Sequence, residues 1–169
     1  MRQKEEKQNH TPAVKFDHVT FTYAGAGAPS LKDISFQAMP GETIGIIGGT
    51  GSGKSTLVSL IPRFYDPQDG QVYMDGENVT EYTRKSIGEK VGIVQQRSVL
   101  FQGSIRDNLK WGDENATDED IWKAIEIAQA KEVVEGKMEK LDFQLEQNGR
   151  NLSGGQKQRL AIARAVVKK

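Results

Sequence analysis

The 169-residue sequence predicts an α/β protein in which an antiparallel, β-rich part comes first and a helical part follows. Two observations predict this class. Alternating apolar residues and turn signals in the first part of the chain are typical of paired antiparallel strands. Later apolar runs are followed by glycine-rich or polar loops and helix-like patterns, which are typical of strand–loop–helix units. We therefore expect a β-subdomain joined to a helical subdomain.

The antiparallel strands are predicted from period-two alternation. Apolar and polar residues alternate from Val14, and we expect this strand to end at Tyr23. A turn-rich loop separates it from a second strand at 31–36, which Pro40-Gly41 closes. Residues 71–74 predict another strand, and the Asp-Gly pair after it predicts a turn.

Two short apolar runs lack this alternation. Residues 43–47 and 91–94 are continuous apolar stretches, which is the pattern of strands buried on both faces of a parallel sheet. Helices are expected from Lys54 to Pro62, from Thr117 through Ala128, and from Leu152 to Lys169. Thr117 is expected to cap its helix, because acidic residues occupy the first turn after it.

Composition excludes several classes of function. Formal net charge is zero, with 23 basic and 23 acidic residues, so nothing indicates a nucleic-acid partner. The sequence has no cysteine and only two histidines, His10 and His18, which excludes disulfides and argues against a zinc site. No apolar run approaches the roughly 18 residues that span a bilayer. Residues 1–12 are polar and predict a linker or tail.

A phosphate-binding loop is the clearest chemical motif. Residues 48–55, GGTGSGKS, fit the pattern G-x-x-x-x-G-K-[ST], between an apolar run and a helix pattern. Glycines let backbone N–H groups point at phosphates. The Lys54 ammonium suits the β- and γ-phosphates of ATP, and the Ser55 hydroxyl suits Mg²⁺. The motif predicts a P-loop NTPase-type core that uses ATP and Mg²⁺.

A second motif, Leu152-Ser153-Gly154-Gly155-Gln156, lies about a hundred residues downstream. Ser153 is placed to cap the helix that follows, and the two glycines leave backbone N–H groups open at its N-terminus, where an anion is favoured. With both motifs in this order, residues 14–169 resemble the nucleotide-binding domain of the ATP-binding-cassette family, with its RecA-like core, antiparallel β-subdomain and helical signature subdomain.

The resemblance implies roles for individual residues. Tyr23 would stack on adenine, and Gln96, rather than its neighbour Gln95, would contact Mg²⁺ and the attacking water. The signature would contact ATP held by a second nucleotide-binding domain, arranged head to tail in a homo- or heterodimer. The implied contacts to the chain's own ATP are Tyr23, Gly48, Gly49, Thr50, Gly51, Ser52, Gly53, Lys54, Ser55 and Thr56, and those to the partner's ATP are Ser153, Gly154, Gly155 and Gln156.

The resemblance also implies an organisation of the chain. We expect a polar tail at 1–12 and a partial nucleotide-binding domain at 13–169, divided into a β-subdomain with the phosphate loop (13–80), a glutamine loop (91–101) and a helical subdomain with the signature (102–169). Segments 99–109 and 145–151 resemble those of exporters of the multidrug or lipid type. The membrane part of an exporter would be contacted through its coupling loops, on the cytoplasmic side of the membrane.

The family's remaining core strands and catalytic glutamate are expected to follow the signature helix, beyond Lys169. The complete protein is then expected to hydrolyse ATP to drive export, and this chain alone is expected to be inactive. The alternatives are an importer subunit, a non-hydrolysing regulatory half-site, and a cassette protein acting on DNA or ribosomes. The last is disfavoured because residues 57–151 show no sustained heptads.

Overall fold

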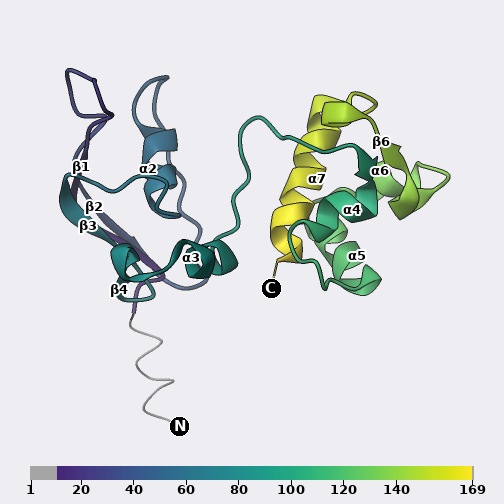
Figure 1. Cartoon of the computed structure of the whole chain (residues 1–169), viewed down its shortest axis with the longest axis horizontal. Coiled ribbons are helices and arrows are strands. Elements are labelled where there is room, and N and C mark those ends of the chain that lie inside the picture. The colour runs from purple at the N-terminus through teal and green to yellow at the C-terminus, as the bar shows by residue number, and fades with distance from the viewer. Residues whose placement is uncertain (1–10, 169) are drawn as a thin grey trace, which may run out of the picture. The chain divides into compact units, whose positions relative to one another are not determined.

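The computed structural model describes residues 11–168 and divides the chain into two units, one ending at Val91 and one beginning at Gly92 (Figure 1). Each unit is described by itself. Most of the predicted tail, together with His10, lies outside the described residues.

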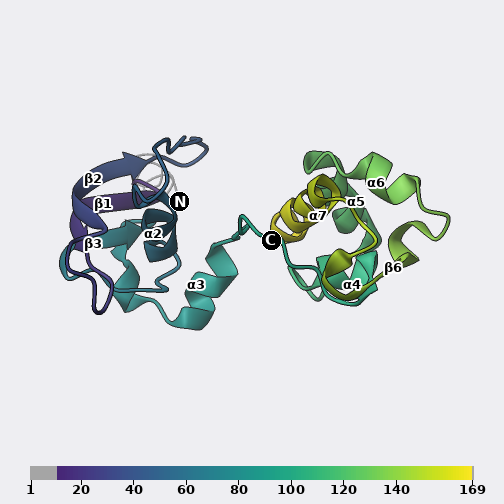
Figure 2. The ribbon, with the colours of Figure 1, turned by 90° about the horizontal axis from the view of Figure 1, so that it is seen from above.

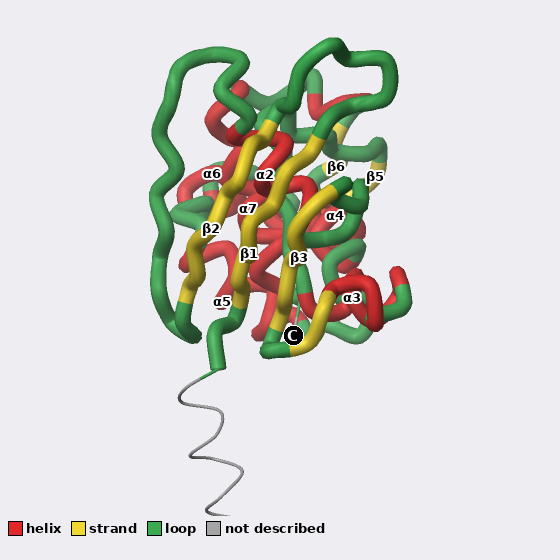
Figure 3. The backbone as a smooth tube through the Cα atoms, turned by 90° about the vertical axis from the view of Figure 1, so that its left-hand side faces the viewer, coloured by secondary structure: helices red, strands yellow, loops and turns green. Residues whose placement is uncertain are grey.

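The first unit contains a four-stranded antiparallel sheet. Strand β1 lies at its centre, and Figure 3 shows β2 and β3 on its two sides. Val14 of β1 is opposite Ala38 of β2 and Met74 of β3. The sheet confirms the strands predicted from alternation. The strands are β1 (Val14–Phe21), β2 (Leu31–Ala38), β3 (Asp69–Met74) and β4 (Glu77–Asn78), in the order β2-β1-β3-β4.

Two helices complete the core of this unit. Helix α2 (Lys54–Leu60) packs against the sheet (Figure 2), and α3 (Arg84–Lys90) follows a 3₁₀ turn, η1 (Val79–Glu81). The helix expected after Lys54 is therefore confirmed. Phe16 of β1, Leu60 of α2 and Val72 of β3 are almost completely buried together. Burying side chains of this size contributes about 1.5–3 kcal/mol each, so this cluster joins α2 to the sheet.

The two predicted parallel strands are wrong. Residues 43–47 and 91–94 form no strand, and within residues 11–168 neither segment pairs with a strand of a sheet. Ile44, Ile46, Ile47 and Ile93 are exposed, and Ile47 is 96% accessible. A strand of this kind is stable only between neighbours on both edges. A continuous apolar run indicates that a segment favours burial, but the run alone does not supply the neighbouring strands with which the segment would pair.

The second unit is mainly helical. Its longest helix, α7, begins after Ser153 and packs against both α4 and α5. A short two-stranded ladder pairs Gly103 with Leu145. The elements are β5 (Gly103–Ser104), α4 (Ile105–Lys110), α5 (Asp118–Ile127), α6 (Lys131–Glu135), η2 (Lys140–Asp142), β6 (Gln144–Leu145), η3 (Gln147–Gly149) and α7 (Gly154–Val167).

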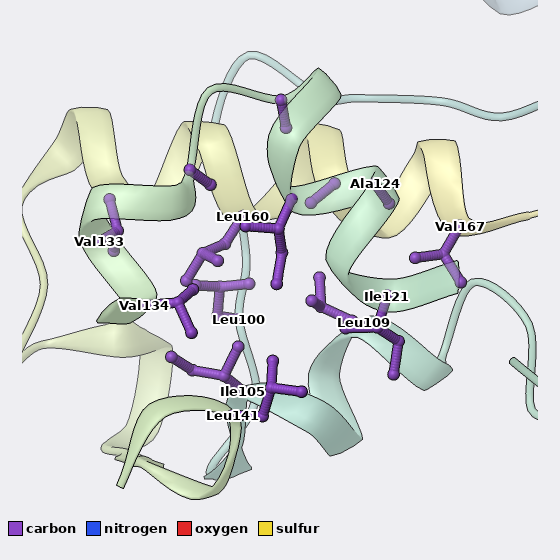
Figure 4. Packing of buried hydrophobic residues seen from close by; sticks show 14 of the residues in the cluster. Leu100, Ile105, Leu109, Ile121, Ala124, Val133, Val134, Leu141, Leu160 and Val167 are labelled. Atoms are coloured by element: carbon purple, nitrogen blue, oxygen red, sulfur yellow. The ribbon is translucent and has the colours of Figure 1, made fainter. Parts of the chain in front are cut away.

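Helix caps and an apolar core hold this unit together. Thr117 caps α5 as predicted, in a reciprocal box with Asp120, and Ser104 and Asp107 form the same box on α4. Hydrogen bonds with Ser104 lower the pKa of Asp107. Figure 4 shows the side chains of α4, α5, α6 and α7 converging on one cluster, which includes Ile105, Leu109, Ile121, Val134 and Leu160.

Candidate functional site

A pocket of about 280 Å³ lies in the first unit, beside the start of α2. It is formed by the loop that precedes α2, by the first turn of that helix, and by residues between β1 and β2. The structure thus brings seven of the predicted contact residues to one place. The lining residues are Tyr23, Ser30, Gly51, Ser52, Gly53, Lys54, Ser55 and Thr56. Ser30 was not predicted, because no motif marks the end of that loop.

The Lys54 side chain folds back over the phosphate loop. Its Nζ donates to the carbonyl oxygens of Gly48 and Gly49, both at 2.7 Å, and to Ser52 Oγ at 3.2 Å. These bonds account for two predicted residues outside the pocket lining and hold the ammonium within the loop. Thr50 completes the turn between Gly49 and Gly51. The ammonium is therefore bound by oxygens of its own loop in this structure.

The Tyr23 ring lies in the same pocket and is 37% exposed. Its hydroxyl shares a hydrogen bond of 3.1 Å with Thr56 Oγ1 in the first turn of α2. The aromatic ring is thus tied to the helix that begins at the phosphate loop. A flat apolar surface and a phosphate-binding loop in one pocket can accept the two chemically different ends of a nucleotide.

The residues of the second motif, called the signature (152–156), lie at the N-terminus of α7 in the second unit. Ser153 Oγ accepts from the Gln156 N–H at 3.3 Å, and Gln156 Oε1 accepts from the Ser153 N–H at 3.0 Å. The predicted cap is confirmed. The role of Gln156 in it was missed, although Ser-x-x-Gln can be read from the sequence as a capping box. Gly154 and Gly155 are exposed in the first turn, with open space where a Cβ would stand.

Replacing Gln156 by alanine is expected to destabilise the chain by about 1 kcal/mol, because the Ser153 N–H loses its partner at the helix end. Gln156→Glu keeps an acceptor at the same position and should retain the stability. Gln158→Ala, at an exposed position of the same helix, is the matched control. Urea unfolding followed by circular dichroism measures all three. Equal loss in Gln156→Ala and Gln158→Ala would contradict a capping role.

Gln96 lies in an exposed bend of the second unit, a few residues before a tightly held segment. Asn108 of α4 holds that segment: its Oδ1 accepts from the Phe101 N–H at 2.7 Å, and its Nδ2 donates to the carbonyl oxygens of Phe101 and Ser104 at 2.9 and 3.0 Å. Phe101 stacks on Trp111 at 4.4 Å between ring centroids. Asn108 therefore sets the backbone that follows Gln96, a role that no sequence pattern indicated.

The surroundings of two arginines in the second unit shift their pKa values. The Arg164 guanidinium lies 5.9 Å from the centroid of the Phe101 ring, and burial lowers its pKa. Arg106 binds Asp118 and Asp142, and these hydrogen bonds raise its pKa. In the described part of the chain no cluster of three or more His, Cys, Asp or Glu side chains could hold a metal ion.

Comparisons with known proteins agree on one family. A profile described as ABC transporter matches residues 31–169. An uncharacterized ABC transporter ATP-binding protein of Mycobacterium tuberculosis is 48% identical over 94% of this chain and 28% of its own length. A β-(1→2)glucan export ATP-binding/permease protein of Agrobacterium vitis is 43% identical over 92% of this chain and 26% of its own length.

A solved structure gives the same likeness. The structure of a bacterial Atm1-family ABC exporter with ATP bound matches with a TM-score of 0.87 and 36% identity, over 95% of this chain and 28% of that one. These likenesses confirm the predicted fold class and the predicted resemblance to ATP-binding-cassette exporters. The chain spans between 26% and 28% of the length of these three proteins. No helix among residues 11–168 is long and apolar enough to cross a membrane.

Proposed function

Because this chain belongs to the ABC transporter family, we propose that its first unit binds ATP and that the complete protein uses ATP hydrolysis to drive export across a membrane. The observation that carries the proposal is the pocket in which the Lys54 ammonium and the Tyr23 ring meet. The relatives support export in particular, since two of them are described as an export ATP-binding/permease protein and an ABC exporter.

ATP binding would replace the present hydrogen-bond partners of Lys54 by phosphate oxygens. Lys54 Nζ now bonds three oxygens of its own loop. Phosphate oxygens carry full charge and accept shorter, stronger hydrogen bonds than neutral carbonyls. The ammonium would therefore turn to the β- and γ-phosphates, while loop N–H groups surround them and the Tyr23 face receives the adenine. The gain in charge pairing offsets the loss of the loop's internal bonds.

The pocket suits Mg²⁺ delivered with ATP. Mg²⁺ prefers oxygen ligands and is bound by few protein groups together with substrate phosphates. The exposed Ser55 in the pocket lining fits this requirement, and no carboxylate cluster competes with it among the described residues. We assign the Ser55 hydroxyl to this ion. Bound Mg²⁺ would neutralise charge that builds up on the phosphates during hydrolysis.

The second unit would complete the site of another copy or a related domain. The N-terminus of α7, at Ser153 to Gly155, leaves the backbone N–H groups of Gly154 and Gly155 open, where an anion is favoured. We propose that these residues and Gln156 contact the γ-phosphate held by a second nucleotide-binding domain, head to tail. Gln96 would orient the attacking water and pass the movement to coupling loops of a membrane part on the cytoplasmic side.

ATP binding is tested by thermal unfolding of the chain with and without Mg-ATP. A ligand that binds only the folded state adds about 2.7 kcal/mol at a hundredfold excess over its dissociation constant. We expect that gain in the parent chain and almost none in Lys54→Ala, which removes the positive charge from the loop. Lys85→Ala removes an exposed lysine of α3 in the same unit and should keep the gain.

Two results would contradict the proposal. A parent chain that Mg-ATP does not stabilise has no working site. Equal stabilisation of the parent and Lys54→Ala would mean that ATP binds elsewhere on the chain.

A further inference from the structure

The turn after α2 lies against Tyr23 from the side. This support turn, residues 63–68, carries Tyr65, whose ring centroid is 5.3 Å from that of Tyr23 with the planes at 86°. Phe21 approaches Tyr23 at 4.9 Å and 85°, and approaches Tyr65 at 5.4 Å. Near-perpendicular pairs at these separations are an attractive arrangement of aromatic rings. Three rings therefore lock one another, and only Phe21 among them is fully buried.

The support turn also holds the backbone next to Tyr23. The Gln68 side chain accepts from the Thr22 N–H at 2.7 Å and donates to the Thr22 carbonyl oxygen at 2.9 Å. The Gln68 N–H adds a bond to the Thr20 carbonyl oxygen at 3.1 Å. One amide side chain thus continues the strand pairing where β1 has ended, one residue before Tyr23. Neither the ring contacts of Tyr65 nor the hydrogen bonds of Gln68 involve the phosphate loop.

The support turn is itself anchored. Arg63 has a left-handed backbone, with φ of 55°, as the chain leaves α2. Its Nε donates to Asp66 Oδ1 at 2.7 Å and its Nη1 donates to the Thr80 carbonyl oxygen at 3.0 Å. The bond to Asp66 lies within the turn, and the bond to Thr80 connects the turn to η1. Tyr65 and Gln68 therefore project from a fixed backbone toward Tyr23.

We propose that Tyr65 and Gln68 are positioning residues that fix the Tyr23 ring for stacking on the base of the bound nucleotide. The inference rests on the proposed function of the pocket. It states that the part of the ATP affinity that depends on the base requires the support turn. Tyr23 is followed by a loop of alanine and glycine, which restrains it little. A ring held in its bound orientation loses less conformational freedom when the ligand arrives. Without the support turn the ring would keep only Phe21 and the Thr56 hydroxyl as partners, and more of its order would have to be gained at the moment of binding.

The test separates the two ends of the nucleotide. Dissociation constants are measured by calorimetry for Mg-ATP and for Mg-tripolyphosphate, which offers the phosphate loop its ligand but has no base. Tyr65→Leu is expected to weaken ATP binding about two- to twelvefold, the range of one aromatic pair, and to leave tripolyphosphate binding unchanged. Tyr65→Phe keeps the ring and should retain both affinities. Gln68→Ala, which retains every ring, should reproduce the selective loss.

A double-mutant cycle distinguishes positioning from direct contact. In a Tyr23→Leu chain the ring to be positioned is gone, so Tyr65→Leu should weaken ATP binding no further. An additive loss would overturn the inference, because Tyr65 would then touch the base itself. Equal loss of ATP and tripolyphosphate affinity in both Tyr65→Leu and Gln68→Ala would overturn it too. A parent chain that binds neither ligand would instead refute the proposed function on which the inference rests.

Discussion

Gly53→Ala is expected to lose about 3 kcal/mol of unfolding free energy, together with the ATP response. Gly53 has φ of 87°, a left-handed conformation that costs an L-residue about 1–2 kcal/mol. An added Cβ would stand 2.5 Å from the Ser30 carbonyl oxygen and 2.9 Å from Leu31 Cδ2. The Ser30 backbone cannot move freely, because its N–H bonds Phe21 at 2.8 Å. The loop would have to shift and would take Lys54 with it.

Gly51→Ala is the matched control. Gly51 has φ of 81°, but no atom lies within 4 Å of the position its Cβ would take. It should therefore show only the backbone cost, about 1–2 kcal/mol. Urea unfolding followed by circular dichroism gives both values, and Mg-ATP titration gives the binding. If the two variants lost equal stability, the close approach of Gly53 to Ser30 would have no energetic weight.

Asn108→Leu is expected to destabilise the second unit by about 3 kcal/mol, since it leaves one N–H and two carbonyl groups without their partner. Asn108 is only 2% exposed, and leucine has the same number and branching of side-chain heavy atoms, so the loss is chiefly one of hydrogen bonds. The backbone at Phe101 should loosen first, because two of the three bonds end there.

Hydrogen exchange resolves this change at single residues. The Phe101 amide should lose protection in Asn108→Leu, while amides in the middle of α7 exchange only as fast as the lower global stability allows. Asn115→Leu changes an exposed asparagine of the same unit and should alter neither stability nor Phe101 protection. Unchanged protection at Phe101 in Asn108→Leu would show that water replaces the side chain at no cost.

The parts of the fold that the sequence predicts are those with short-range causes. Alternation in β1 and β2 reflects a sheet with one buried face, and the caps at Thr117 and Ser153 involve residues only three positions apart. The phosphate loop is predicted for the same reason, because its lysine bonds oxygens two to six residues away.

What could not be predicted depends on partners distant in sequence or unspecified by the segment itself. Gln68 meets Thr22 across 46 residues, and nothing in either residue type announces the pairing. The apolar run 43–47 has the composition of a strand but no ladder partner within the described residues. Composition sets a tendency, and the neighbouring chain decides whether a strand forms.

The distribution of aromatic residues between the two units has an optical consequence. Both tryptophans, Trp111 and Trp122, belong to the second unit, and all four tyrosines belong to the first. Fluorescence excited where only indole absorbs therefore follows the second unit alone, while second-derivative absorption, which separates the phenol band from the overlapping indole band, follows the first. One denaturant titration read through both signals yields two separate unfolding curves, without any label or engineered probe.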